Sequence, residues 1–343
     1  MTRVLIADDS PIFAHVLAEV LGEEKDLSLT GVATDGAQAV AMTRSSRPDV
    51  IVMDVVMPVL DGFEAVSRIM AEQPTPILMM TGDSRGRLAD LGFEALRRGA
   101  VDLVLKPAGW PFSAEERRML RDRVRAAAGV RPRHPPRSVV RASERPVAAS
   151  AEVVGVAAST GGPAALALLL RAVPAGFPAG IAIVQHLSPG FVDALARWIA
   201  PSCPLRVSVA SDGDACGPGA VLIAPDDRHL TIDARGRARL SAEPRSAIYR
   251  PSADVLFESI AASFGRRSAG IVLTGMGDDG ARGLAAMRRA GAVTIAQDEA
   301  SSVVFGMPRA AIASGAAEHV VPLEGIAEAL CRAIGHRPGS SPP

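Results

Sequence analysis

The stretch Val153-Val154-Gly155-Val156-Ala157-Ala158-Ser159-Thr160-Gly161-Gly162-Pro163 predicts the fold of the second half of this 343-residue chain. Its apolar, β-branched start is typical of a buried strand. The small residues that follow predict a tight turn, and Ala164 to Arg171 predict a helix that tolerates Pro163 in its first turn. Ser159 would stand where the strand ends. On this stretch alone, the serine is more simply a helix N-cap than a nucleophile or a phosphate ligand.

The composition is typical of a globular protein with room for two domains: 48% of the residues are hydrophobic and 22% are charged. No apolar run approaches the ~20 residues that cross a bilayer, and the early strand pattern Val4-Leu5-Ile6-Ala7 argues against a signal peptide. The formal net charge of +0 gives no reason to expect a nucleic-acid partner. We therefore expect a cytoplasmic, monomeric protein that is not inserted in a membrane. The three cysteines are far apart and odd in number, which disfavours disulfide bonds and a zinc site: Cys203, Cys216 and Cys331.

The first 125 residues alternate predicted strands with predicted helices. We expect strands at Val4–Ala7, Ser28–Ala33, Val50–Met53, Pro76–Met80 and Val101–Leu105, and helices at Ile12–Leu21, Gly36–Arg47, Gly62–Glu72, Arg87–Arg98 and Ser113–Ala128. This alternation predicts an α/β fold with a doubly wound parallel sheet. Such sheets carry their functional groups at the carboxyl ends of the strands.

Charged and hydroxyl side chains follow four of these strands: Asp8-Asp9, Asp54, Thr81 and Lys106. Carboxylates that converge in one crevice repel each other unless a hard cation such as Mg²⁺ lies among them. An aspartate beside that ion could accept a phosphoryl group, whose oxygens Thr81 and Lys106 would bond. Lys106 is also one of only two lysines in a chain whose positive charge is otherwise arginine, so a compact ammonium group is expected to matter there.

Together with Met57-Pro58, Asp61-Gly62 and Pro107, these residues resemble the receiver domain of response regulators over about residues 3 to 122. The resemblance implies a flavodoxin-like fold, Asp54 as the phosphoacceptor and a histidine kinase as the phosphodonor. It also implies that Thr81 is the hydroxyl that moves on phosphorylation and that Lys106 contacts the phosphoryl group. The implied Mg²⁺ ligands are Asp8, Asp9, Asp54 and the backbone carbonyl of Val56.

One receiver position departs from the usual pattern. Receivers usually carry an aromatic residue three positions before the lysine, and this chain has Leu103 there. The resemblance therefore implies phosphorylation without extending to a switch based on a rotating aromatic ring.

Residues 126–150 form a segment rich in proline and arginine between the two halves. Its low apolar content predicts an extended tether, and the lack of aromatic residues between its arginines disfavours nucleic-acid binding. The expected organisation is a receiver domain over 1–125, this linker, and a second domain over 151–338.

The second half also alternates strands and helices. We expect strands at Val153–Ala157, Gly180–Val184, Val207–Ala210, Val221–Ala224, His229–Asp233, Gly270–Leu273, Val293–Ala296 and His319–Pro322, and helices at Ala164–Ala172, Phe191–Ala200, Ser252–Phe264, Gly280–Arg289, Pro308–Ser314 and Leu323–Ala333. This pattern predicts a second doubly wound, mainly parallel sheet. An antiparallel pair is allowed for within Val221–Asp233.

The strand ends of this half carry a hydroxyl, an imidazole and carboxylates. The first strand runs into Ser159, the second into His186, and Ile271-Val272-Leu273 runs into Thr274-Gly275-Met276-Gly277-Asp278-Asp279-Gly280. These are the side chains of a Ser-His-Asp hydrolase, and N–H groups of the glycine-rich turns could hold an oxyanion. Position alone does not separate Asp278 from Asp279, one of which we expect to cap the following helix. We expect His229 and His319 to be structural.

With Gln185-His186, Tyr249-Arg250-Pro251-Ser252 and Gly306-Met307-Pro308, these motifs resemble the chemotaxis protein-glutamate methylesterases/glutamine deamidases, whose receiver, linker and catalytic domain would cover nearly the whole chain. The resemblance implies a Rossmann-like methylesterase domain without a cofactor, with Ser159, His186 and Asp279 as the triad. It places Thr160 and Met276 at the border of the oxyanion site. The implied substrates are methylated glutamates on the cytoplasmic helices of chemoreceptors, and an unphosphorylated receiver would cover the catalytic edge.

Two alternatives remain open on the sequence. The protein could be a phosphorylation-dependent binding protein whose triad residues dock a receptor or a kinase. It could also be a serine hydrolase acting on a methylated protein outside chemotaxis, because a triad does not reveal the surface of its substrate.

Overall fold

The computed structural model describes residues 1–130 and 151–334, apart from positions 85, 108, 110 and 246. The chain divides into two compact units, Met1–Pro136 and Arg137–Pro343. Most of the predicted linker, 126–150, and the last residues of the predicted second domain lie outside the described residues. Within the described residues, no helix combines the length and the apolar character needed to cross a bilayer.

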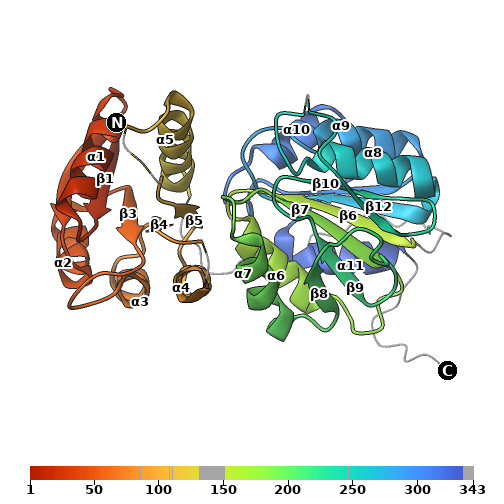
Figure 1. The fold of residues 1–343 in the computed structure, drawn as a ribbon, viewed down its shortest axis with the longest axis horizontal. Coiled ribbons are helices and arrows are strands. Elements are labelled where there is room, and N and C mark those ends of the chain that lie inside the picture. Colours follow the sequence, from red (N-terminus) through yellow and green to blue (C-terminus); the bar gives the residue numbers. More distant parts are fainter. Residues whose placement is uncertain (85, 108, 110, 131–150, 246, 335–343) are drawn as a thin grey trace. The chain divides into compact units, whose positions relative to one another are not determined.

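The first unit is a five-stranded parallel sheet in the order β2-β1-β3-β4-β5, the flavodoxin-like order (Figure 1). Its strands are β1 (Thr2–Ala7), β2 (Leu27–Ala33), β3 (Val50–Asp54), β4 (Ile77–Thr81) and β5 (Asp102–Leu105). Its helices are α1 (Pro11–Gly22), α2 (Gly36–Ser46), α3 (Gly62–Glu72), α4 (Gly86–Arg97) and α5 (Ala114–Ala128). The predicted alternation and fold class of this half are confirmed.

Local sequence explains where four of these helices begin. Ser10, Asp35, Asp61 and Ser113 each accept a hydrogen bond from the backbone N–H three residues further on, at the starts of α1, α2, α3 and α5. A polar N-cap satisfies N–H groups that have no partner inside the helix. The central strands β3 and β4 are apolar and buried almost throughout, as expected for strands that helices cover on both faces.

The second unit is a seven-stranded parallel sheet in the order β14-β13-β12-β6-β7-β9-β8. Its strands are β6 (Val153–Ala158), β7 (Gly180–Gln185), β8 (Arg206–Val209), β9 (Ala220–Ile223), β12 (Ser268–Val272), β13 (Val293–Gln297) and β14 (His319–Val321). The strands β7, β8 and β9 lie on one side of β6, in the spatial order β7, β9, β8. The later strands β12, β13 and β14 lie on its other side. The strand order therefore reverses at β6, and ligands of open α/β sheets bind at such a switch point.

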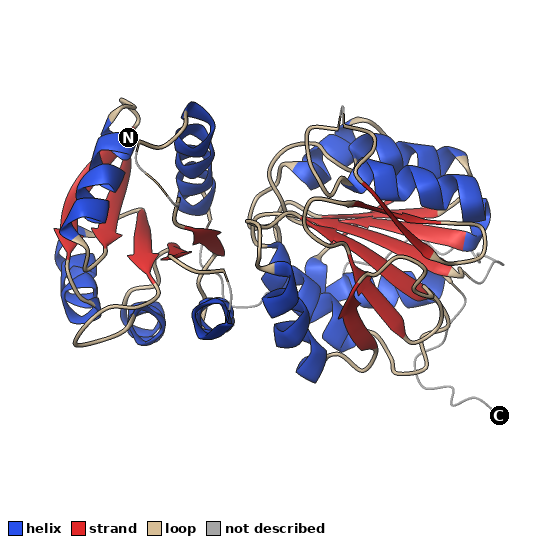
Figure 2. Ribbon diagram, viewed as in Figure 1, coloured by secondary structure: helices blue, strands red, loops and turns tan. Residues whose placement is uncertain are grey.

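Helices cover both faces of this sheet (Figure 2). α6 (Gly162–Ala172), α7 (Val192–Ile199) and α11 (Leu323–Ala333) lie on one face, and α8 (Ala253–Phe264), α9 (Ala281–Arg289) and α10 (Met307–Ala313) lie on the other. Short 3₁₀ turns follow α7 and α8 at Ala200–Ser202 and Gly265–Arg267. The predicted doubly wound architecture of this half is confirmed.

The predicted antiparallel pair is displaced from its expected position. β9 lies in the parallel sheet, and the antiparallel pair is β10 (His229–Ile232) with β11 (Ala238–Ser241), which the sequence analysis did not predict. The turn between them depends on Gly236, whose φ is +70°, a conformation that costs glycine little. A glycine in a short loop between two strands was the available signal for this hairpin.

Candidate functional site

The carboxyl edge of the first sheet brings together the side chains predicted there. Asp8 and Lys106 directly follow β1 and β5, while Asp54 and Thr81 end β3 and β4. The Lys106 ammonium lies 2.7 Å from a carboxylate oxygen of Asp54 and 2.7 Å from one of Asp8. It also lies 4.5 Å from the centre of the Phe13 ring. One cation thus joins the buried carboxylate of Asp8 and the partly buried carboxylate of Asp54 at this edge.

The charge balance of this crevice fits a divalent cation. Burial raises the pKa of the Asp54 carboxyl, the nearby Asp8 charge raises it further, and the Lys106 ammonium only partly opposes them. Burial alone would lower the pKa of Lys106, but its hydrogen bonds to Asp54 and Asp8 outweigh this and leave it raised. Ligand oxygens of Asp8, Asp9 and Asp54 lie within 4.8 Å of one another. Three carboxylates against one ammonium are a donor set suited to Mg²⁺.

Three other predicted receiver residues have distinct positions. The Thr81 hydroxyl donates to the backbone carbonyl of Asp83 at 3.2 Å, within the loop that follows β4. Val56 is exposed in the loop after β3, close in sequence to Asp54. Leu103 is buried and packs so tightly against α4 that a Cβ on Gly92 would fall 2.6 Å from it. Leu103 is therefore a core residue on the face of β5 that packs against α4.

At the second site, Ser159 directly follows β6 in a turn that only small residues can form. A Cβ on Gly162 would lie 2.0 Å from the Gln185 side chain, and one on Gly275 would lie 2.7 Å from the Cβ of Ser159. The N-cap of α6 is Gly161, at φ +75°, with no side-chain cap. The Ser159 hydroxyl hydrogen-bonds to none of the described residues, so the simple N-cap interpretation of this serine is wrong.

The register of the sheet brings His186 beside Ser159. β6 and β7 are neighbours, with Ala158 paired to Gln185, and both candidate residues come directly after these strand ends. The His186 backbone N–H donates to the Ala158 carbonyl at 2.9 Å. The Gln185 side-chain NH₂ donates to the carbonyls of Ser159 and His186, at 2.8 and 3.0 Å. Gln185 thus ties the two strand ends together.

The loop after β12 supplies the carboxylate from the other side of β6. A carboxylate oxygen of Asp279 lies 2.9 Å from His186 Nε2. The same carboxylate accepts from the Ser252 hydroxyl at 2.9 Å and from the backbone N–H groups of Ala253 and Asp254 at 2.7 and 3.0 Å. Asp279 therefore lies on the N-terminus of α8, where the exposed N–H groups favour negative charge.

These contacts determine the roles of the two imidazole nitrogens. Burial raises the pKa of Asp279, but the His186 hydrogen bond and the backbone donors outweigh it and leave that pKa lowered. An ionised carboxylate only accepts hydrogen bonds, so Nε2 of His186 carries the proton. Nδ1 is buried and has no hydrogen-bond partner among the described residues. A buried nitrogen with an unused lone pair is available as a base.

The two neighbouring aspartates are now distinguished. Asp279 is buried on α8, whereas Asp278 is exposed and contributes its backbone carbonyl to the start of α9. The expectation that one of them caps α9 with its side chain is wrong. Asp254 takes that position, accepting from the N–H groups of Gly280 and Gly283 at 3.0 and 2.7 Å. The N-terminus of α8 thus binds the carboxylate of Asp279, which precedes α9, and Asp254 of α8 caps the N-terminus of α9.

Backbone N–H groups border Ser159 without a partner. Those of Thr160, Gly161 and Met276 donate to no acceptor in the part of the chain that the structure describes. Thr160 is buried and its carbonyl accepts from the Thr274 hydroxyl at 3.0 Å, which fixes the turn after Ser159 against the loop after β12. N–H groups fixed in this way can stabilise an oxyanion.

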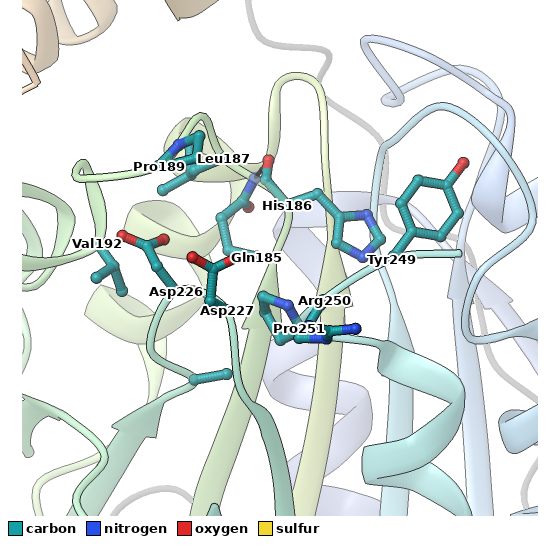
Figure 3. A pocket seen from close by; sticks show the side chains of 11 residues that line it. Gln185, His186, Leu187, Pro189, Val192, Asp226, Asp227, Tyr249, Arg250 and Pro251 are labelled. Atoms are coloured by element: carbon teal, nitrogen blue, oxygen red, sulfur yellow. Dashed lines mark hydrogen bonds between the residues drawn. The ribbon is translucent and has the colours of Figure 1, made fainter. Parts of the chain in front are cut away.

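A small cavity of about 100 Å³ lies beside His186 (Figure 3). Its wall includes Gln185, Asp226, Tyr249 and Arg250. The Tyr249 ring is stacked on the His186 ring, with centroids 4.7 Å apart and an angle of 17° between the planes. Asp226 accepts from the N–H of Gly190 at 2.7 Å and so holds the loop after β7.

The sequence analysis missed the supporting residues of this site. The sequence analysis placed Ser252 and Asp254 at the start of a predicted helix, and it named Gln185, Tyr249 and Ser252 only as parts of motifs, without a role for any of them. His229 is structural as expected: it is buried and bonds the Pro244 carbonyl and the Ser252 N–H. His319 is the first residue of β14, which confirms the predicted strand that begins there.

Comparison with known proteins gives the same division of the chain. Residues 154–330 match the family model described as CheB methylesterase, and residues 4–111 match that of the response regulator receiver domain. A protein-glutamate methylesterase/protein-glutamine glutaminase of Anaeromyxobacter dehalogenans is 47% identical over 96% of both chains. One of Myxococcus xanthus is 44% identical over 98% of this chain and 95% of that relative. The crystal structure of the Thermotoga maritima CheB methylesterase catalytic domain has a TM-score of 0.51 at 37% identity, covering 53% of this chain and 97% of that one.

Proposed function

Because this chain belongs to the CheB methylesterase family, we propose that it is a phosphorylation-activated serine esterase of chemotaxis adaptation. Its reaction is the hydrolysis of glutamate methyl esters on chemoreceptors to glutamate and methanol. The names of the relatives add the deamidation of protein glutamine. The observation that carries the proposal is the bond from His186 Nε2 to Asp279, which leaves a buried Nδ1 without a partner among the described residues, at the strand end next to Ser159.

In the first half of the reaction, His186 Nδ1 takes the proton of the Ser159 hydroxyl as its oxygen attacks the ester carbonyl. The imidazolium that forms is stabilised by Asp279, which needs no proton of its own because α8 already stabilises its charge. The oxyanion of the tetrahedral intermediate accepts from the free N–H groups of Thr160 and Met276.

In the second half, His186 returns its proton to the departing methanol and an acyl-enzyme remains on Ser159. Methoxide is a poor leaving group, so this proton transfer contributes to the rate by about 10² to 10⁴. Water then attacks the acyl group, with His186 again acting as base, and releases the glutamate carboxylate. For a glutamine substrate the same steps release ammonia.

The receiver crevice supplies the regulation. Asp54 accepts the phosphoryl group, and Lys106 and Thr81 bond its oxygens. Asp8, Asp9, Asp54 and the backbone carbonyl of Val56 would hold Mg²⁺, which would offset the charges of the carboxylates and of the incoming phosphoryl oxygens. The raised pKa of Asp54 and the surplus of carboxylates over ammonium groups support this assignment.

Gating connects the two sites. Phosphorylation adds negative charge at Asp54, and this change at the receiver crevice raises the rate of ester hydrolysis at Ser159. A histidine kinase supplies the phosphoryl group, the substrate helices lie in the cytoplasm, and the enzyme acts there as a monomer.

The test is methanol release from methylated receptor fragments, with and without a small-molecule phosphodonor and Mg²⁺. We expect release that rises with the phosphodonor and is absent in Ser159→Ala; Ser208→Ala, on the edge strand β8, serves as the control. Release that ignores the phosphodonor would retain the esterase and remove the gate. No release from folded wild-type protein would favour a binding protein, and trapping of Ser159 by a serine-directed reagent would then show whether the triad is competent.

A further inference from the structure

Tyr249 covers one face of the imidazole of His186 and has no part in the reaction steps above. Figure 3 shows the two rings side by side at the wall of the cavity. Their centroids are 4.7 Å apart and their planes are nearly parallel, at 17°. Tyr249 is the single tyrosine of the chain and 37% of it is exposed, so its position is not explained by burial in the core.

A buried histidine holds the loop that carries Tyr249. We call residues 242–252, between β11 and α8, the Tyr249 loop. His229 Nε2 lies 3.3 Å from the Pro244 carbonyl, and its Nδ1 accepts from the Ser252 N–H at 3.2 Å. The single ring therefore bonds the loop near its beginning and at its end. Because Nδ1 accepts while Nε2 donates, this imidazole is neutral, and burial lowers its pKa in agreement.

The Tyr249 loop also contacts the loop of the catalytic carboxylate. The Ser252 hydroxyl, at the loop's end, bonds Asp279 at 2.9 Å. A Cβ on Gly277, which has a φ of +88°, would lie only 2.9 Å from the Tyr249 hydroxyl oxygen. Tyr249 is thus positioned both by its own loop and by the loop that presents Asp279 to His186.

A stacked ring acts on the histidine in two ways. It blocks rotation of the imidazole about its bond to Cβ, and this rotation would break the Nε2 bond to Asp279 and turn Nδ1 away from Ser159. Its π face also attracts the positive charge that the imidazole carries while it holds the serine proton. The attraction to the charge is stronger in the transition state than in the free enzyme, because the imidazole becomes positively charged only as it takes the serine proton.

We propose that Tyr249 is a positioning residue of the esterase, which holds the His186 ring in the plane that bonds Asp279 and stabilises the imidazolium formed during acyl transfer. This inference rests on the proposed function and deepens it. Tyr249 is assigned no contact with the reacting atoms.

The test compares Tyr249→Leu with Tyr249→Phe in the full-length, phosphodonor-activated protein. Leucine removes the stacking, and we expect kcat for methanol release to fall roughly 3- to 10-fold with little change in KM. Phenylalanine keeps the ring and should restore kcat to within about twofold. Ile248→Ala is the matched control, since Ile248 is the adjacent residue of the same loop and is 91% exposed.

A second readout is independent of turnover. The proton between His186 Nε2 and Asp279 should give a downfield proton resonance in wild-type, Tyr249→Phe and Ile248→Ala protein, and a broadened or absent one in Tyr249→Leu. If leucine disturbs folding, Tyr249→Gln repeats the comparison. A Tyr249→Leu enzyme with wild-type kcat and resonance would overturn the proposal, as would a Tyr249→Phe enzyme as impaired as Tyr249→Leu. Absence of methanol release from wild type would remove the proposed function, while the resonance would still decide the positioning role.

Discussion

In the first sheet, the carboxylates after β1 and at the end of β3 lie together and share Lys106, whereas in the second sheet Asp279 lies on the N-terminus of α8 and accepts hydrogen bonds from its backbone N–H groups. Both groups stand at the carboxyl edge of a parallel sheet; Asp8 and Asp279 are buried, and Asp54 is partly buried. The pKa of Asp54 is raised, chiefly by burial, while that of Asp279 is lowered because hydrogen bonds outweigh burial. The same architecture thus holds one carboxylate whose charge is only partly stabilised and one whose hydrogen bonds outweigh the cost of burial.

The difference matches the two kinds of chemistry. A phosphoacceptor site must admit a cation and a phosphoryl group, so its own donors leave room for both. A triad carboxylate must stay ionised and fixed through the whole reaction, so four donors around Asp279 prevent it from moving or taking a proton: His186, Ser252, Ala253 and Asp254.

The strongest test of this comparison replaces Asp279 by asparagine. An amide in that position presents an N–H group where only an acceptor fits, so His186 would lose the tautomer that leaves Nδ1 free. We expect kcat for methanol release to fall about 10³- to 10⁴-fold. Asp278→Asn is the matched control, because Asp278 is the adjacent exposed aspartate and should retain kcat. Equal losses in the two variants would remove Asp279 from the triad.

The second test replaces the phosphoacceptor. Asp54→Asn should bring the ratio of methanol release with and without phosphodonor down to unity, while basal release stays measurable because the triad is intact. Asp49→Asn is the control, since Asp49 precedes the amino end of the same strand, where it bonds Arg3 rather than Lys106. A phosphodonor response of wild-type size in Asp54→Asn would show that another residue is the acceptor.

The strand ends made much of both sites predictable from the sequence. Parallel strands bring their carboxyl ends to one edge, so Ser159 and His186, or Asp8 and Lys106, needed only a correct strand assignment. The ends of these strands could be predicted because short polar or glycine-rich segments follow their apolar runs in the sequence. The strand β10 was predicted, but β11 and its pairing with β10 were missed because β11 is four residues long and carries weak periodicity.

The support of the triad could not be predicted from local sequence. Ser252 and Tyr249 lie more than twenty residues from Asp279 and about sixty from His186, and tertiary packing of the Tyr249 loop brings them there. The choice between Asp278 and Asp279 depends on which of them faces α8, and the sequence gives no local signal for that. Contacts fixed by packing between distant segments leave no periodic pattern.

A smaller effect is expected from metal. Mg²⁺ at ten times its Kd should stabilise the receiver unit by about 1.4 kcal/mol, which raises its Tm by a few degrees, because the ion offsets the repulsion among Asp8, Asp9 and Asp54. The catalytic unit should not respond, because protein donors already surround Asp279. Differential scanning calorimetry with Mg²⁺ and with EDTA measures both transitions. If Mg²⁺ shifted only the unfolding transition of the catalytic unit, the proposed contrast between the two carboxylate sites would be wrong.

The most local expected effect concerns a single donor to the Asp279 carboxylate. Ser252→Ala removes the hydroxyl that bonds Asp279 and caps α8, and we expect it to cost about 1 to 2 kcal/mol of unfolding free energy at neutral pH. The control is Ser263→Ala on the same helix, whose hydroxyl bonds the uncharged Ile232 carbonyl. Urea unfolding of both variants between neutral pH and pH ~3 compares them, and the pH dependence separates a charged acceptor from a neutral one.

The direction of the expected pH dependence follows from the lowered pKa of Asp279. A carboxyl whose pKa is lower in the folded state contributes stability that is fully present above its unfolded pKa and is lost as the pH falls through the folded one. The cost of Ser252→Ala should therefore shrink as the pH falls below the ordinary aspartate range and through the lowered pKa of folded Asp279, where the carboxyl loses the charge that its donors stabilise. The cost of Ser263→Ala should not follow this pH dependence, since a carbonyl does not titrate. Parallel pH profiles for the two variants would mean that the Ser252 hydroxyl acts only as a helix cap, and that the backbone N–H groups of α8 alone stabilise the carboxylate.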